Sequence, residues 1–197
     1  MADGRDDPDI HWVEPKLRGI IPLDGFHLSR SLERSMLRQD YELRVDHDFR
    51  AVLHGCADRP ETWISRNIED LYVGLHDLGH AHSVEVWSEG ALIGGTYGVA
   101  LGAGYFGESM FSRRTDASKI ALAWLVHRLN AGGFQLFDTQ FLTSHLASLG
   151  GQEISRKAYQ AQLAQAVEGR ATFHPAGYAP TAMDVVQLLS HFRTQTS

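Results

Sequence analysis

The stretch from Ser83 to Ser112 constrains the fold most, because it holds three strand-like runs separated by two tight turns. The runs are Ser83–Ser88, Leu92–Leu101 and Tyr105–Ser112, and the turns are Ser88-Glu-Gly-Ala and Gly102-Ala-Gly. This arrangement predicts an antiparallel meander. Glycines within the second run, at Gly94, Gly95 and Gly98, indicate a bulge or the close approach of another backbone or a ligand.

Helical spacing flanks this predicted meander. Residues 62–78 place apolar side chains on one face, and a helix over 117–131 can begin at an Asp116 cap and end at Gly132-Gly133. The residues after it, 134–140, predict a strand. Weaker signals predict helices over 29–38, from Asp46 or Asp48 to Ala57, after Thr143, from Ser155 to about Val167, and near 182–192, while the first 26 residues, with Pro8, Pro15 and Pro22, predict irregular structure.

This order of elements indicates an α+β fold, with antiparallel strands wrapped by helices. A chain of 197 residues suits one medium domain, or a core domain with a small partner. Its 18 Lys and Arg against 24 Asp and Glu give a net charge of −6, which argues against coating nucleic acid by charge alone.

Cysteine content and hydropathy bear on location. The single Cys56 excludes an internal disulfide, so the cytoplasm is the default expectation. The most apolar stretch, Ile120–Leu129, is short and contains His127 and Arg128, and it predicts no membrane span.

Three polar residues are candidates for chemistry on the predicted strands. Regular alternation would place Glu108 on one face with Phe106 and Met110, between two large apolar side chains. Asp138 and Gln140 are two residues apart, so they also share a face. A buried acid needs a partner, although each of these residues could equally be an ordinary polar residue at a strand end.

Other candidate motifs are weaker. Ser109 lacks the glycine two residues later that a nucleophile elbow requires, since that place holds Phe111. His76, His80 and His82 lie across a predicted helix end without a H-E-x-x-H or Cys-x-x-Cys pattern, which favours a structural corner and predicts no metal site.

A series of ordered motifs resembles one known family. They are Thr62-Trp-Ile-Ser, Leu78-Gly-His-Ala-His-Ser-Val-Glu-Val-Trp87, Gly94-Gly95, Tyr97-Gly98, Gly107-Glu-Ser-Met-Phe-Ser-Arg113, Ala117-Ser-Lys119, Gly132-Gly133, Asp138-Thr-Gln140 and Ala147-Ser-Leu-Gly150. Together they resemble the leucyl/phenylalanyl-tRNA–protein transferases, from about Arg18 through Gly169.

The resemblance implies a fold and a division of the chain. It implies an acyltransferase domain similar to the GNAT fold over 61–169, with a central, mostly antiparallel sheet flanked by helices. Residues 1–60 would form a truncated N-terminal subdomain, and residues 170–197 a tail with one candidate helix. Family members carry a Tyr-x-x-Gly-x-Phe-Pro motif in a segment that precedes this sequence, so truncation is expected here.

The resemblance also implies an activity. Leu or Phe, and sometimes Met, would move from aminoacyl-tRNA to the N-terminal Arg or Lys of another protein, marking that protein for degradation. The acceptor amine attacks an ester that is already activated, so no cofactor or metal is expected, and proximity and orientation carry the catalysis. A monomer is the default expectation.

The resemblance also implies roles for individual residues of this chain. Glu108 would hold the α-amino group of the donor amino acid, while Gln140 positions the attacking amine and Asp138 tunes it. Trp63 would stack on the terminal adenine of the tRNA, and Arg113, Arg114 and Lys119 are candidates for tRNA contact. The expected apolar cup for the donor side chain consists of Met110, Leu122, Leu125, Leu129 and Phe137, each of which could equally be core.

Two alternatives remain. An acyl-CoA N-acyltransferase on the same fold would want a glycine-containing pyrophosphate turn, which Ser112-Arg-Arg-Thr-Asp-Ala117 lacks. A non-catalytic tRNA- or peptide-binding remnant has no obvious use for Glu108, Asp138 and Gln140 together.

Overall fold

A seven-stranded sheet forms the centre of the computed structural model. The structure describes the backbone of residues 13–195 and the side chains of residues 13–192. Residues 1–12, which include part of the predicted irregular start, and residues 196–197 lie outside the described part. The strand order is β2-β3-β4-β5-β6-β1-β7, and the strands are β1 (Leu17–Ile20), β2 (Glu42–Val45), β3 (Ala81–Ser88), β4 (Ala91–Leu101), β5 (Gly104–Ser112), β6 (Leu136–Gln140) and β7 (Gln152–Ser155).

Neighbouring strands are antiparallel except β5 and β6, which are parallel. The parallel pair is joined by α4 (Ala117–Ala131), the kind of crossover that a parallel connection needs. The predicted meander is confirmed as β3-β4-β5. Gly94 permits the close approach of α4, because a Cβ there would lie 2.5 Å from Cβ of Ala117.

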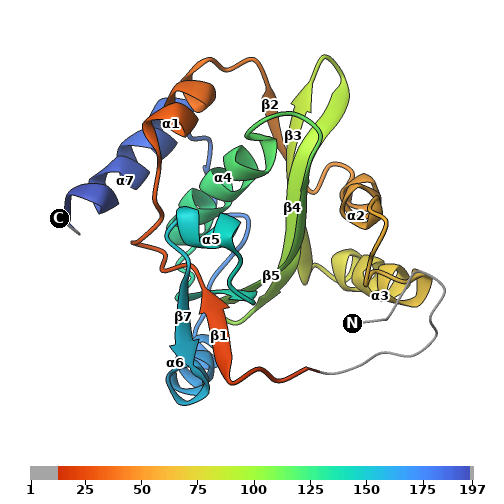
Figure 1. The fold of residues 1–197 in the computed structure, drawn as a ribbon, viewed down its shortest axis with the longest axis vertical. Coiled ribbons are helices and arrows are strands. Elements are labelled where there is room, and N and C mark those ends of the chain that lie inside the picture. Colours follow the sequence, from red (N-terminus) through yellow and green to blue (C-terminus); the bar gives the residue numbers. More distant parts are fainter. Residues whose placement is uncertain (1–12, 196–197) are drawn as a thin grey trace.

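Helices cover both faces of the sheet. Figure 1 shows α1 (Arg30–Leu37), α4 and α7 (Ala182–Gln195) on one side, and α2 (Phe49–Ala57) and α3 (Arg66–Asp77) on the other. Each side has its own apolar core, the larger around α4 and the smaller between α2, α3 and the meander. Two more helices, α5 (Ser144–Ser148) and α6 (Arg156–Glu168), follow β6. The predicted α+β fold with a mostly antiparallel sheet is therefore confirmed.

Helix caps follow the sequence with one exception. Asp48, Thr143 and Ser155 each accept a hydrogen bond from a backbone N–H in the first turn of the helix they precede. Asp116 does not cap α4, which corrects the prediction. Its backbone is left-handed at φ 66°, and its carboxylate instead accepts hydrogen bonds from Lys119 Nζ at 2.9 Å and Ser35 Oγ at 3.1 Å.

The described residues before position 61 and after position 169 pack on the same sheet and core as the rest. β1 and β2 belong to the central sheet, and Phe173, Val185 and Leu189 are buried in the core around α4. The division of the chain at residues 60 and 169 stays a prediction. Among the described helices, none has both the length and the apolar character needed to cross a membrane.

Candidate active site

A pocket of about 370 Å³ lies where β5 and β6 stop pairing. The two strands pair only from Gly104 to Phe106 on β5 and from Leu136 to Asp138 on β6. Beyond this point β5 continues to Ser112, so its side chains can border a pocket. The lining consists of Arg59, Trp63, Thr96, Gly107, Glu108, Ser109, Met110, Leu122, Phe137, Thr139, Gln140, Phe141, Thr143, His145 and Leu146.

A β-bulge places Glu108 in this pocket. Tyr97 on β4 pairs with Ser109, and Gly98 pairs with Gly107, so Glu108 is the extra residue of β5. The predicted regular alternation is therefore interrupted, and Phe106 does not line the pocket with Glu108. Bulges commonly re-aim a side chain beside an active site, which is the effect seen here.

Glu108 is held by two neutral hydrogen-bond donors. Gln140 Nε2 donates to Glu108 Oε2 at 2.7 Å, and the Tyr72 hydroxyl donates a second hydrogen bond. Burial raises the pKa of Glu108, and the bonds from Tyr72 and Gln140 only partly oppose this rise. The carboxylate is thus an under-compensated negative charge beside a largely apolar pocket, and a cationic group is its natural partner.

Asp138 lies beneath the pocket and is saturated with donors. Its side chain is 0% exposed and forms an ion pair with Arg18, whose terminal nitrogen lies 2.7 Å from Oδ2. The Tyr159 hydroxyl donates to the same oxygen at 2.5 Å, and the Gln140 backbone N–H donates to Oδ1 at 2.6 Å. Asp138 does not line the pocket, so its contact with a substrate would be indirect, through Gln140.

Gln140 is held in an uncommon backbone conformation. Its φ is 64°, in the left-handed region that side chains other than glycine seldom adopt. The bond from its N–H to Asp138 supports this turn at the end of β6 and so directs the amide toward Glu108. Strain of this kind persists only where the surrounding structure imposes it, and it is common at functional sites.

The predicted apolar cup is brought together only in part. Met110, Leu122 and Phe137 line the pocket. Leu125 and Leu129 do not line it. Like Leu122 they are buried in the main core, but of the three only Leu122 also borders the pocket. The stripe of leucines on α4 is therefore mostly core, which narrows the predicted cup to three residues.

Trp63 also lines the pocket, from the segment between α2 and α3.

The three basic residues predicted to contact tRNA do not line the pocket, and each has an acidic neighbour. Arg113 lies 4.0 Å from Asp58, Arg114 lies 2.5 Å from Asp40, and Lys119 lies 2.9 Å from Asp116.

Sequence reasoning missed several residues in or beside the site, among them Arg18, Arg59, Tyr72 and Tyr159. Arg18 is 120 positions from Asp138, and only the pairing of β1 with β6 brings them together. Arg59 lines the pocket and donates to Ser109 Oγ at 3.1 Å. The sequence offered one signal for Arg18: a buried Asp138 requires a partner. That requirement does not identify which residue supplies it.

A second hollow, of about 480 Å³, lies between α4, β2 and the segment before α7. No predicted site residue lines it. The pocket at Glu108 therefore remains the candidate active site.

Comparisons with known proteins identify the family of this chain. The sequence profile described as "Leucyl/phenylalanyl-tRNA protein transferase" matches residues 20–164. A leucyl/phenylalanyl-tRNA–protein transferase of Cereibacter sphaeroides (strain ATCC 17025 / ATH 2.4.3) is 62% identical over 187 residues, covering 95% of this chain and 87% of that protein. The protein of the same name from Ruegeria sp. (strain TM1040) is 58% identical over 197 residues, 100% of this chain and 91% of that protein.

Among solved structures, a GCN5-related N-acetyltransferase-like protein from Streptococcus suis has a TM-score of 0.42 at 15% identity. The match covers 71% of this chain and 60% of that protein, and we infer nothing about fold or function from so slight a likeness. The sequence matches, in contrast, show the family: this chain belongs to the leucyl/phenylalanyl-tRNA–protein transferase family.

Proposed function

We propose that this protein transfers leucine or phenylalanine from aminoacyl-tRNA to the N-terminal amine of acceptor proteins. The observation that carries the proposal is the pairing of Glu108 with Gln140 at the edge of an apolar pocket. An aminoacyl ester presents an ammonium group and an apolar side chain on one carbon atom, and the pocket offers an anion and an apolar wall close together.

Glu108 would bind the α-ammonium of the donor amino acid. The positive charge supplies the compensation that Tyr72 and Gln140, as neutral donors, do not. The donor side chain would then lie against Met110, Leu122 and Phe137. Because this wall selects by shape, discrimination between side chains is expected to be about 1–3 kcal/mol per misfitting methylene group.

Gln140 would position the attacking amine. Its Nε2 donates to Glu108, so its carbonyl oxygen is the end that can accept a hydrogen bond from the acceptor. Asp138, held by Arg18 and Tyr159, fixes the backbone turn that presents this amide. Catalysis would then rest mainly on holding amine and ester in reactive geometry.

The end of the tRNA would lie on Trp63 and Arg59. An indole ring can stack on the terminal adenine, and the Arg59 guanidinium can contact a nearby phosphate. Arg113, Arg114 and Lys119 remain proposed contacts for more distant parts of the tRNA, and each would exchange its acidic partner for phosphate.

The remaining expectations follow from the family. The acceptor would begin with Arg or Lys, the modified protein would be degraded, the enzyme would act as a monomer, and its dependence on charged tRNA favours the cytoplasm. None of these steps calls for a cofactor.

Transfer of radiolabelled Leu or Phe from charged tRNA to a peptide beginning with Arg tests the proposal. The same peptide with an acetylated N-terminus is the control. We expect label on the free peptide alone. No transfer with retained tRNA binding would instead favour a non-catalytic binding protein, and transfer from acetyl-CoA would favour an acyl-CoA N-acyltransferase.

A further inference from the structure

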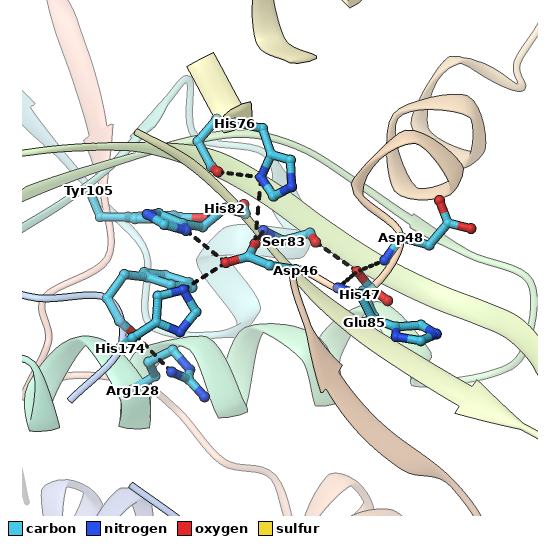
Figure 2. Close-up of polar contacts among 12 residues, drawn as sticks. Asp46, His47, Asp48, His76, His82, Ser83, Glu85, Tyr105, Arg128 and His174 are labelled. Atoms are coloured by element: carbon cyan, nitrogen blue, oxygen red, sulfur yellow. Dashed lines mark hydrogen bonds and ion pairs between the residues drawn. The ribbon is translucent and has the colours of Figure 1, made fainter. Parts of the chain in front are cut away.

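Asp46, His82 and His174 converge beside strand β3 (Figure 2). None of the three lines the pocket at Glu108. His82 Nδ1 lies 2.8 Å from Asp46 Oδ2, and His174 Nε2 lies 2.9 Å from the same oxygen. One ligand atom from each residue lies within 4.8 Å of the others. The three come from separate parts of the chain: the segment after β2, strand β3 and the segment between α6 and α7.

The surroundings hold the two inner residues in place. The Ser83 N–H donates to Asp46 Oδ1 at 2.7 Å, which fixes the carboxylate and leaves Oδ2 toward the imidazoles. The His82 ring is buried and stacks on Phe173 with centroids 4.2 Å apart. Supporting contacts of this kind orient ligands in metal sites.

His174 closes the cluster from the solvent side. Its side chain is 58% exposed, and with His82 it lines a surface hollow of about 490 Å³. Solvent therefore has access to the point between the two rings.

We propose that Asp46, His82 and His174 form a binding site for a divalent transition-metal ion, best suited to Zn²⁺. Two imidazoles and one carboxylate are ligands that zinc prefers, with water completing a tetrahedron. Donor atoms around a tetrahedral zinc ion lie about 3.3 Å apart, given metal–ligand bonds of about 2.0–2.2 Å. Both imidazole–carboxylate distances, 2.8 Å for His82 and 2.9 Å for His174, are shorter than this, so each must lengthen by about half an ångström when the ion binds. The exposed His174 ring can move outward, and the Asp46 carboxylate must shift away from His82.

Arg128 opposes the ion. Its guanidinium donates to the Phe173 carbonyl oxygen at 2.7 Å and lies over the Tyr178 ring, close enough to Asp46 for their charges to interact. The carboxylate charge and two neutral imidazoles must outweigh this repulsion. A bound ion would tie the segment that leads to α7 onto β3, so its expected role is to stabilise the fold rather than to take part in transfer.

The test uses the full chain without a histidine tag, stripped with chelator and titrated with Zn²⁺ alone by calorimetry, with thermal melts in parallel. We expect one ion per chain and a higher melting temperature with zinc. His174→Gln keeps an amide N–H that can donate to Asp46, yet it removes the imidazole ligand. Because losing even a supporting contact of a ligand costs 10- to 100-fold in affinity, we expect this variant to bind at least about tenfold more weakly.

His27→Ala is the matched control, since His27 is an exposed histidine elsewhere on the surface. It should bind zinc like the parent and show the same thermal response. The proposal is overturned if the parent chain binds no zinc. It is also overturned if His174→Gln binds as tightly as the parent, because other histidines would then hold the ion.

Discussion

Glu108 and Asp138 lie on neighbouring strands, and their two carboxylates have very different hydrogen-bond and charge partners. Asp138 is fully buried, and it receives a guanidinium, a phenol and a backbone N–H. Glu108 lines the pocket and has only neutral donors, so its pKa is raised mainly by burial. The difference indicates that Asp138 holds the structure of the site, whereas Glu108 keeps binding capacity for a substrate cation.

Breaking the Asp138 ion pair should have the largest effect on stability. Arg18→Met leaves a buried, uncompensated carboxylate, so the free energy of unfolding should fall by about 3–5 kcal/mol. Chemical denaturation measures this. Arg44→Met removes a solvent-exposed ion pair with Glu42 and should cost no more than about 1 kcal/mol. Equal losses in the two variants would mean that the Asp138 pair is no stronger than a surface pair.

Neutralising Glu108 should affect function and spare stability. Glu108→Gln removes the charge that would hold the donor ammonium, an interaction worth about 1.5–3 kcal/mol, so affinity for aminoacyl-tRNA should fall roughly 10- to 100-fold. Stability at pH 7 should stay the same or rise, since the raised pKa means that folding disfavours the charged form. A clear loss of stability with normal affinity would reverse the roles given to the two acids.

Substituting two leucines of α4 in turn distinguishes a residue that lines the pocket from one that only packs in the core. Leu122→Ala should change the ratio of Leu to Phe transfer by about tenfold, because Leu122 lines the pocket. Leu125→Ala should cost about 2–5 kcal/mol of stability and leave this ratio unchanged. Competition assays with both charged tRNAs measure the ratio, and a similar shift in both variants would extend the cup to Leu125.

The pH dependence of donor binding should show the smallest effect. Because the pKa of Glu108 is raised, its proton should add above the usual range of glutamate as pH falls, and donor affinity should decline there. The stability contribution has the opposite sign: it is present below the unfolded-state pKa and is lost as pH rises through the folded-state pKa. Glu108→Gln should remove both dependences, and an unchanged profile would assign them to another group.

Local patterns in the sequence predicted the long elements. The meander and α4 were predictable because their periodicity and turns are local signals, and the same holds for the caps at Asp48, Thr143 and Ser155. Strands β1, β2 and β7 were missed. Each has four residues and owes its form to partners distant in sequence, as when Leu17 pairs with Ser155.

The site was predictable in its residue types and less so in its geometry. The family resemblance indicated Glu108, Asp138 and Gln140, but the bulge at Glu108 depends on its pairing with β4, which no local alternation reveals. The same limit applies to Leu125 and Leu129, because a helix has the same sequence pattern of leucines whether that face lines a pocket or packs in the core.

The most direct test separates binding from transfer in Asp138→Asn, which keeps the shape of the side chain and removes its charge. Aminoacyl-tRNA affinity and the single-turnover rate of transfer to an Arg-initiated peptide are measured on the same folded protein. Our account predicts a collapse in rate with nearly unchanged affinity, because Asp138 acts through Gln140. A parallel fall in affinity and rate would contradict it and make Asp138 a binding residue.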